Sequence, residues 1–353
     1  MIKILIVDDS AFMRKILSDL FVAEADFTVV DVARNGREAI DKVKQLKPDV
    51  VTLDVEMPIM DGISALEIIM REVPTPVVMV SSLTKVGADA TIRALENGAV
   101  DFVTKSEGAI SGIDNIRMAL VAKCRAAARA NVKQLRKVNE VKPQIAEYKS
   151  SKVFNSPTNE QIIAIGTSTG GPRALQELLT RLPGNLPCGV VIVQHMPPGF
   201  TKSLAIRLDS LCALSIKEAE NNDIVKPGMV FIAPGDFHMT VEREGNKTIV
   251  KLNQSPPIGS HRPSVDPLFE SVARVYGKWA TGVILTGMGH DGSRGMKNIK
   301  DSGGYTIAED QSTTVVFGMP KSAIELGVID KVVPLPAIAS EIIRYLQTKH
   351  GGV

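Results

Sequence analysis

Short apolar runs recur along the whole chain, separated by segments with helical spacing. In the amino-terminal half they cover residues 2–7, 28–33, 49–53, 76–80 and 99–103. In the carboxy-terminal half they cover residues 162–165, 189–193, 229–232, 280–285 and about 305–308. Continuous runs of this length are typical of strands buried on both faces of a parallel sheet. The chain is therefore predicted to be an α/β protein with two doubly wound domains, the second mostly parallel.

The two series of runs are separated by a long basic helix and a polar segment. From residue 114 to about residue 138 the apolar side chains have helical spacing, with Leu120, Val121 and Cys124 on one face. The polar segment that follows contains two prolines and lacks sustained periodicity, as linkers do. A chain of 353 residues is also long enough for two domains. We predict a first domain over residues 1–125, a linker over 126–158 and a second domain over 159–350.

One segment of the second domain has a different pattern. Residues 237–252 read FHMTVEREGNKTIVKL, and polar and apolar side chains alternate there around Glu244, Gly245 and Asn246. Alternation about a Gly-Asn pair predicts a β-hairpin inserted in the sheet.

Charge and cysteine usage exclude several classes of protein. The 41 lysines and arginines nearly balance the 39 aspartates and glutamates, so the net charge of +2 gives no reason to expect a nucleic-acid partner. The three cysteines are scattered without metal-type spacing, which indicates inert thiols in a reducing compartment. The first apolar run soon meets Asp8 and Asp9 and is too short for a signal sequence or a membrane span. We expect a soluble, cytoplasmic protein with no membrane insertion.

Charged and hydroxyl side chains follow the strands of the first series. They are Asp8, Asp9, Asp54, Ser81 and Lys105. The carboxyl ends of parallel strands meet at one edge of a sheet, which is where doubly wound domains bind ligands. Grouped carboxylates repel one another unless a cation neutralises them, and an all-oxygen group suits Mg²⁺. A single aspartate at such a position is commonly a helix cap, but the five side chains together favour a site.

The stretch from Gln161 to Gly171 predicts a strand, a tight turn and a helix. Its sequence, QIIAIGTSTGG, contains the pattern G-x-S-x-G at Gly166, Ser168 and Gly170. In this pattern a serine hydroxyl is held at a sharp turn for use as a nucleophile. The alternative interpretation is a glycine-rich turn that binds phosphate or only connects two elements.

Two later strand ends supply partners for Ser168. His195 follows the strand GVVIVQ, and Asp291 lies a few residues beyond the strand GVILT. A serine hydroxyl needs a base to take its proton, and the base needs a carboxylate to hold its tautomer. The order Ser, His, Asp disfavours an α/β-hydrolase, in which the histidine comes last. The alternative histidines and carboxylates are His238, His261, His290, His350, Asp236, Asp266 and Asp310, and we expect His261 to line the same cleft or cap a loop.

The motifs of the first 125 residues resemble the receiver domain of bacterial response regulators. They are VDDS, LDVEMPIMDG, VSS and DFVTK. The resemblance implies a flavodoxin-like sheet, in which Asp54 accepts a phosphoryl group from a histidine kinase. It implies that Mg²⁺ is held by Asp8, Asp9, Asp54 and the backbone carbonyl of Glu56. It also implies that Lys105 contacts the phosphoryl group and that Ser81 and Phe102 move in response.

The motifs of the second half resemble the catalytic domain of the chemotaxis methylesterase (CheB) family. They are IGTSTGGP, VQHMPPGF, PGDFHM, HRPSVDPLF and LTGMGHDG. The resemblance implies a Ser168, His195 and Asp291 triad that needs no cofactor and hydrolyses glutamate methyl esters of chemoreceptors to release methanol. It also implies deamidation of receptor glutamines, and a receiver that covers the esterase cleft until it is phosphorylated. Backbone N–H groups near Thr169 and Met288 are candidate oxyanion donors, although the Met288 side chain equally suits a core filler.

A different class of function is a phosphorylation-driven binding module that holds an anion on GTSTGG without catalysis. No Lys-Ser or Lys-Thr pair follows these glycines, as a phosphate-binding P-loop requires. A DNA-binding output is disfavoured because the second half has no helix-turn-helix pattern.

Overall fold

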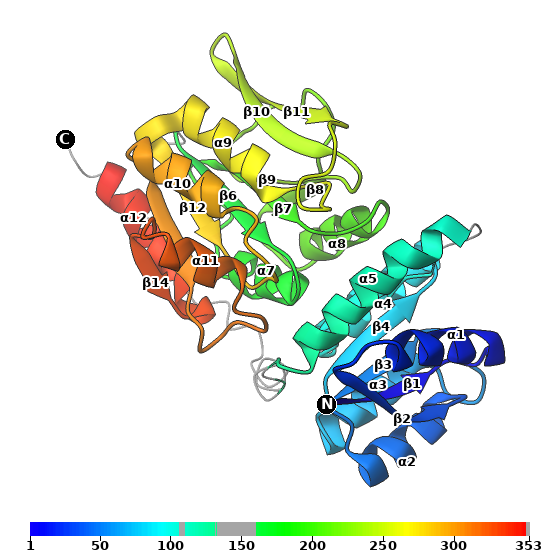
Figure 1. Ribbon diagram of the computed structural model, residues 1–353. Coiled ribbons are helices and arrows are strands. Elements are labelled where there is room, and N and C mark those ends of the chain that lie inside the picture. Colours follow the sequence, from blue (N-terminus) through cyan, green and yellow to red (C-terminus); the bar gives the residue numbers. More distant parts are fainter. Residues whose placement is uncertain (106–109, 131, 133–159, 351–353) are drawn as a thin grey trace. The chain divides into compact units, whose positions relative to one another are not determined.

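The computed structural model describes residues 1–105, 110–130, 132 and 160–350, which belong to two compact units, Met1–Lys142 and Pro143–Val353 (Figure 1). Most of the predicted linker therefore lies outside the described residues. The predicted boundaries at 125 and 159 remain predictions, and the last described helix of the first unit continues to Ala127. None of the helices within the described ranges combines the length and the apolar character that a membrane span requires.

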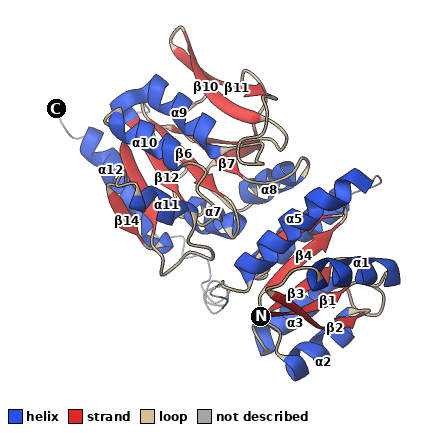
Figure 2. Ribbon diagram, in the orientation of Figure 1, coloured by secondary structure: helices blue, strands red, loops and turns tan. Residues whose placement is uncertain are grey.

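The first unit is a five-stranded parallel sheet with helices on both faces (Figure 2). The strands are β1 (Ile2–Val7), β2 (Phe27–Ala33), β3 (Val50–Asp54), β4 (Val77–Ser81) and β5 (Asp101–Thr104), in the order β2-β1-β3-β4-β5. The helices are α1 (Ala11–Val22), α2 (Gly36–Leu46), α3 (Gly62–Glu72), α4 (Lys85–Glu96) and α5 (Ile110–Ala127). This is the predicted doubly wound receiver fold.

Helix caps explain why the chain turns where it does at the carboxyl edge of this sheet. The side chains of Ser10, Asn35, Asp61 and Thr84 each accept a hydrogen bond from a backbone N–H of the first turn of α1, α2, α3 and α4. Such caps satisfy donors that a helix start leaves without partners. On α5, Leu120, Val121 and Cys124 are buried, as predicted from their spacing.

The second unit contains a seven-stranded sheet in which every neighbouring pair is parallel. Its strands are β6 (Ile162–Thr167), β7 (Gly189–Gln194), β8 (Ser215–Glu218), β9 (Met229–Ile232), β12 (Ala280–Ile284), β13 (Tyr305–Glu309) and β14 (Lys331–Val333), in the order β14-β13-β12-β6-β7-β9-β8. Its helices are α7 (Gly171–Leu179), α8 (Phe200–Asp209), α9 (Val265–Tyr276), α10 (Ser293–Asp301), α11 (Met319–Glu325), α12 (Leu335–His350) and the short 3₁₀ helix η2 (Gly277–Trp279).

The predicted hairpin is present as β10 (His238–Glu244) and β11 (Lys247–Asn253). The prediction that it is inserted in the larger sheet is wrong. The hairpin forms a two-stranded sheet of its own, which packs beside α9 (Figure 1). Strands β8 and β14 were not predicted. Both lie at the edges of the sheet, and most of their side chains are partly or fully exposed. They therefore lack the continuous apolar run of a central strand.

The register of three neighbouring strands places their carboxyl ends level with one another. Thr167 of β6 pairs with Gln194 of β7, and Gly166 pairs with Ile284 of β12. The residues that directly follow β6, β7 and β12 therefore emerge at one edge of the sheet, which is the ligand edge of a doubly wound fold.

Candidate active site and phosphoacceptor site

The turn between β6 and α7 favours glycine at two positions, for different reasons. Gly170 has φ of 80°, in the left-handed region that favours glycine. A Cβ on Gly171 would lie 1.9 Å from Oε1 of Gln194. The N–H of Gly171 donates to the carbonyl of Ser168 at 2.8 Å, which closes the turn. Ser168 lies at the sharp strand-to-helix turn that the sequence predicted and is partly exposed.

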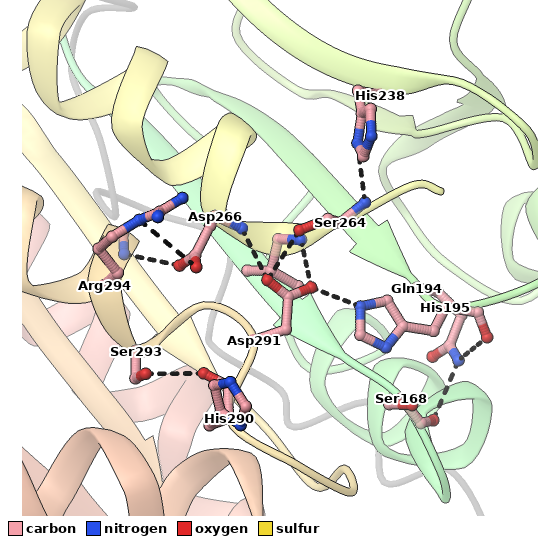
Figure 3. Close-up of polar contacts among 12 residues, drawn as sticks. Ser168, Gln194, His195, His238, Ser264, Asp266, His290, Asp291, Ser293 and Arg294 are labelled. Atoms are coloured by element: carbon pink, nitrogen blue, oxygen red, sulfur yellow. Dashed lines mark hydrogen bonds and ion pairs between the residues drawn. The ribbon is translucent and has the colours of Figure 1, made fainter. Parts of the chain in front are cut away.

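His195 and Asp291 are in direct contact. Nε2 of His195 lies 2.7 Å from Oδ2 of Asp291, and both side chains are largely buried (Figure 3). The carboxylate also accepts hydrogen bonds from the hydroxyl of Ser264 at 2.8 Å and from the N–H groups of Val265 and Asp266 at 2.7 and 3.1 Å. Asp291 thus sits on the first N–H groups of α9, where a negative charge is stabilised.

These partners keep Asp291 ionised. Burial raises the pKa of Asp291, but the hydrogen bond and charge of His195, together with the donors of Val265 and Ser264, hold that pKa well below its usual range. A carboxylate only accepts hydrogen bonds, so Nε2 of a neutral His195 carries the proton. The lone pair is then on Nδ1, which is buried without a hydrogen-bond partner among the described residues. Nδ1 is therefore the nitrogen of His195 that is able to act as a base.

The segments that carry Ser168 and His195 are linked by hydrogen bonds to backbone carbonyl groups. The N–H of His195 donates to the carbonyl of Thr167 at 3.1 Å. Nε2 of Gln194 donates to the carbonyls of both Ser168 and His195, at 3.0 and 3.1 Å (Figure 3). In the part of the chain that the structure covers, no hydrogen bond joins the two side chains themselves; such contacts often tighten only when substrate binds.

The candidate oxyanion donors lie on two loops next to Ser168. Thr169 is buried at the start of the turn, and Met288 is half-buried in the loop after β12. A Cβ on Gly287 would lie 2.9 Å from Cβ of Ser168, so this loop passes directly against the nucleophile.

The alternative histidines have other contacts. The ring of His261 stacks on His195 with centroids 3.9 Å apart, so His261 lines the same site as expected. His238 accepts the N–H of Ser264 on Nδ1 at 3.2 Å and faces the carbonyl of Pro256 with Nε2. The His290 side chain is exposed, and that of His350 lies outside the described side chains.

The alternative carboxylates also have local partners. Asp236 pairs with Nε of Arg262 at 3.0 Å, Asp266 accepts the N–H of Gly295 at 2.8 Å, and Asp310 accepts the N–H of Ser312 at 2.8 Å. No hydrogen bond or ion pair between a histidine and any of these three carboxylates is found within the described ranges.

In the first unit, the carboxylate oxygens of Asp8, Asp9 and Asp54 lie within 4.8 Å of one another. Nζ of Lys105 lies 2.7 Å from Asp54 and 3.0 Å from Asp8. Burial raises the pKa of Asp54 to about 6, and the Lys105 ammonium partly opposes this shift. Grouped carboxylate oxygens are the donors that Mg²⁺ prefers, so the residues fit this ion. Glu56 follows in the exposed turn after β3.

The two predicted switch residues are both buried. The hydroxyl of Ser81 donates to the carbonyl of Gly87 in α4 at 3.1 Å. Phe102 is 3% exposed, and Nζ of Lys123 lies 5.2 Å from its ring centroid and 2.8 Å from its carbonyl oxygen. Phe102 is thus a buried aromatic side chain of β5 that a lysine of α5 contacts.

Comparison with known proteins settles the family. Residues 163–342 match the family described as CheB methylesterase, and residues 4–117 match the response regulator receiver domain. A relative from Archaeoglobus fulgidus, named protein-glutamate methylesterase/protein-glutamine glutaminase, is 49% identical over 98% of this chain and 99% of its own length. The chain belongs to the CheB methylesterase family.

Other members agree with this assignment. A relative of the same name from Symbiobacterium thermophilum is 50% identical over 97% of this chain and 96% of its own length. The solved catalytic domain of the Thermotoga maritima CheB methylesterase is 49% identical and covers 53% of this chain and 99% of its own, with a TM-score of 0.52. The predicted family resemblance is therefore confirmed.

Three residues of this CheB methylesterase unit were not recognised from the sequence, namely Gln194, Ser264 and Thr286. Gln194 directly precedes the candidate base, and Ser264 directly precedes α9, where serine commonly caps a helix. Their positions in the sequence could have identified Gln194 and Ser264 as residues that support the site. Thr286 had none, because its contacts come from loops that are distant in sequence.

Proposed function

We propose that this protein removes methyl groups from glutamate methyl esters of chemoreceptors, deamidates receptor glutamines, and is activated by phosphorylation of Asp54. The observation that carries the esterase assignment is the 2.7 Å contact between His195 and an ionised Asp291, at the strand edge that also carries Ser168. The names of the relatives support methyl-esterified glutamates and glutamines of proteins as the substrate class, and the receiver domain in the same chain supports a role in signalling.

The reaction has two stages. Oγ of Ser168 attacks the γ-carbonyl carbon of the ester while Nδ1 of His195 takes its proton. The tetrahedral adduct expels the methoxide group, which receives this proton from His195 and leaves as methanol. A water molecule then attacks the acyl-enzyme, gives a proton to His195, and releases the glutamate side chain and the Ser168 hydroxyl. In a glutamine substrate, ammonia leaves in place of methanol.

The surroundings stabilise the charges that form. Asp291 faces the imidazolium that His195 becomes, and its own donors keep it from taking the proton. The N–H groups of Thr169 and Met288 are proposed to donate to the oxyanion. A donor of this kind is typically worth about 3 to 4 kcal/mol in the transition state.

The receiver is proposed to restrain the esterase until Asp54 accepts a phosphoryl group from a histidine kinase. Asp8, Asp9, Asp54 and the carbonyl of Glu56 would hold Mg²⁺, which neutralises charge on the incoming phosphoryl group. Lys105 is proposed to contact the new phosphoryl oxygens, which its 2.7 Å contact with Asp54 supports. Ser81 and Phe102 are proposed to move in response, because a dianion at this edge offers new hydrogen-bond acceptors.

The test is methanol and ammonia release from methylated receptor fragments by the whole protein. Ser168→Ala and His195→Ala are expected to lower kcat by roughly 10⁴- to 10⁶-fold, because each removes a member of a cooperating triad. A serine-directed reagent should label Ser168 covalently in the wild-type protein and not in Ser168→Ala. Wild-type rates in either folded variant, or no labelling, would instead favour an anion-binding module.

A further inference from the structure

Thr286 lies two residues beyond the end of β12 and contacts the nucleophile turn in three ways. Its carbonyl accepts the N–H of Ser168 at 3.1 Å and the hydroxyl of Thr167 at 2.9 Å. Its own hydroxyl donates to the carbonyl of Thr169 at 2.9 Å. Thr286 is 1% exposed, so these bonds are shielded from water and fix the orientation of three consecutive residues around the candidate nucleophile.

The remaining groups of Thr286 tie it to two other segments. Its hydroxyl accepts the N–H groups of Val315 and Val316 at 3.2 and 3.0 Å. Its N–H donates to Oε2 of Glu309, the last residue of β13, at 2.8 Å. Glu309 is fully buried and its other oxygen accepts the hydroxyl of Thr313 at 3.0 Å. The polar groups of Thr286 are thus all engaged, and its place in the fold is set from every side.

The loop that continues from Thr286 is held just as firmly. The N–H of Gly287 donates to the carbonyl of Val316 at 3.1 Å, and the carbonyl of Gly287 accepts the N–H groups of Gly318 and Met319 at 3.0 and 2.9 Å. Met288, which carries the second candidate oxyanion donor, is the next residue.

We propose that Thr286 is a positioning residue for the esterase reaction, which fixes the turn of Ser168 and Thr169 relative to the loop of Met288. This inference rests on the proposed function. The side chain does not reach the reacting atoms; it aligns two backbone donors that come from different loops.

The alternative is that Thr286 only satisfies buried backbone groups and so contributes stability alone. The two interpretations differ in what a change at Thr286 does to the transition state. Displacement of oxyanion donors by about 1 Å lowers kcat by on the order of 100-fold, whereas loss of stability lowers the fraction of folded protein and leaves the kcat of the folded fraction unchanged.

The experiment compares Thr286→Val, which removes the hydroxyl at nearly constant volume, with Thr286→Ser, which keeps it. Methanol release and the affinity for a substrate-like peptide boronate, which forms a tetrahedral adduct with a nucleophilic serine, are measured on the whole protein. For Thr286→Val we expect kcat to fall about 10- to 100-fold, KM to stay within about twofold, and boronate affinity to fall in parallel with kcat. Thr286→Ser should recover most of the lost kcat.

Thr306→Val is the matched control. Thr306 is also fully buried, and its hydroxyl donates to the carbonyl of Val328 at 2.7 Å and accepts the N–H of Asp330 at 2.9 Å, but it lies near the amino end of β13. This control should lose stability without losing kcat or boronate affinity. If Thr286→Val does not fold, Thr286→Ser and Thr286→Ala provide the same comparison of hydroxyl present and absent.

Three results would overturn the positioning role: wild-type kcat in the folded Thr286→Val or Thr286→Ala protein, equal impairment of Thr286→Ser, or boronate affinity that does not change when kcat falls. A wild-type protein that neither releases methanol nor binds the boronate would overturn the proposed function itself, and the two failures are thereby distinguished.

Discussion

At Asp291, four hydrogen-bond donors meet two carboxylate oxygens. Two are backbone N–H groups of α9, which cannot reverse their polarity. His195 and Ser264 are the others. The site is therefore specific for an ionised carboxylate, which explains the lowered pKa of Asp291.

Asp291→Asn tests this specificity. The amide would present N–H groups to the backbone donors or to His195, so the imidazole would lose its tautomer, and kcat should fall by roughly 10³- to 10⁴-fold. Methanol release and thermal unfolding are measured together. Asp301→Asn, at an exposed carboxylate at the end of α10, is the control and should leave both quantities unchanged. A folded Asp291→Asn protein with near wild-type kcat would argue against the role of Asp291.

Glu309 is a second buried carboxyl group, with a different consequence. Burial raises its pKa from 4.5 to about 7, although Thr286 and Thr313 donate to it. The folded state therefore binds this proton more tightly than the unfolded state. The contribution of Glu309 to the free energy of unfolding therefore falls as the pH rises from about 4.5 to about 7, and it is constant outside that window.

Glu309→Gln should remove this dependence. The amide oxygen is able to accept the N–H of Thr286, and the hydroxyl of Thr313 is able to accept from the amide nitrogen. Between about pH 4 and about pH 8, the stability of the variant relative to wild type should rise by roughly 3 kcal/mol. Urea unfolding across this range measures the difference, and a difference that does not vary with pH would contradict the assignment.

At the scale of the elements, the site depends on three strands whose exits the sequence already marks. Continuous apolar runs identify β6, β7 and β12, and Ser168, His195 and Asp291 follow them. The sequence does not show that these strands are neighbours. In the fold, β6 lies between β7 and β12, which are far from each other along the chain.

The supporting contacts could not be predicted in the same way. Ser264 contacts Asp291, and Thr286 contacts Thr169, only because separate loops converge on one edge of the sheet. The strands β8 and β14 lack an apolar run, and the hairpin was assigned to the wrong sheet because its alternating pattern does not specify its partner strand. Patterns of burial are visible in a sequence, whereas long-range hydrogen bonds to backbone groups are not.

The turn before α7 gives a prediction at this scale. In Gly171→Ala, the new Cβ would meet Oε1 of Gln194 at 1.9 Å and Oγ1 of Thr167 at 2.5 Å. Displacing Gln194 breaks its bonds to the carbonyls of Ser168 and His195, so we expect a loss of about 1 to 3 kcal/mol in stability and about 10- to 100-fold in kcat.

Gly245→Ala is the control for this substitution. Gly245, in the hairpin turn, has φ of 57° and nothing within 4 Å of an added Cβ. That change should cost about 1 kcal/mol of stability through backbone strain and leave kcat unaltered. Equal kcat in the two variants would show that the position of Gln194 does not matter for the reaction.

At the scale of the whole molecule, two units of similar architecture carry different chemistry at equivalent edges. In both units the functional side chains follow the carboxyl ends of parallel strands, as the doubly wound fold dictates. The first unit carries the proposed phosphoryl acceptor and the second the candidate nucleophile. Under the proposed function, covalent change in the first unit regulates catalysis in the second, although the two sites share no residue.

This separation predicts how the rate responds to phosphorylation. A small-molecule phosphodonor with Mg²⁺ should increase methanol release by the whole protein by about tenfold or more, since a coupling free energy of roughly 1 to 3 kcal/mol is typical between two sites. Asp54→Asn, or removal of Mg²⁺ by a chelator, should abolish the increase. A fragment of residues 159–350 should exceed the rate of the unphosphorylated whole protein and should not respond to the donor, because it lacks Asp54. If the fragment is no faster than the unphosphorylated protein, and the donor does not change the rate of the whole protein, the receiver does not restrain the esterase.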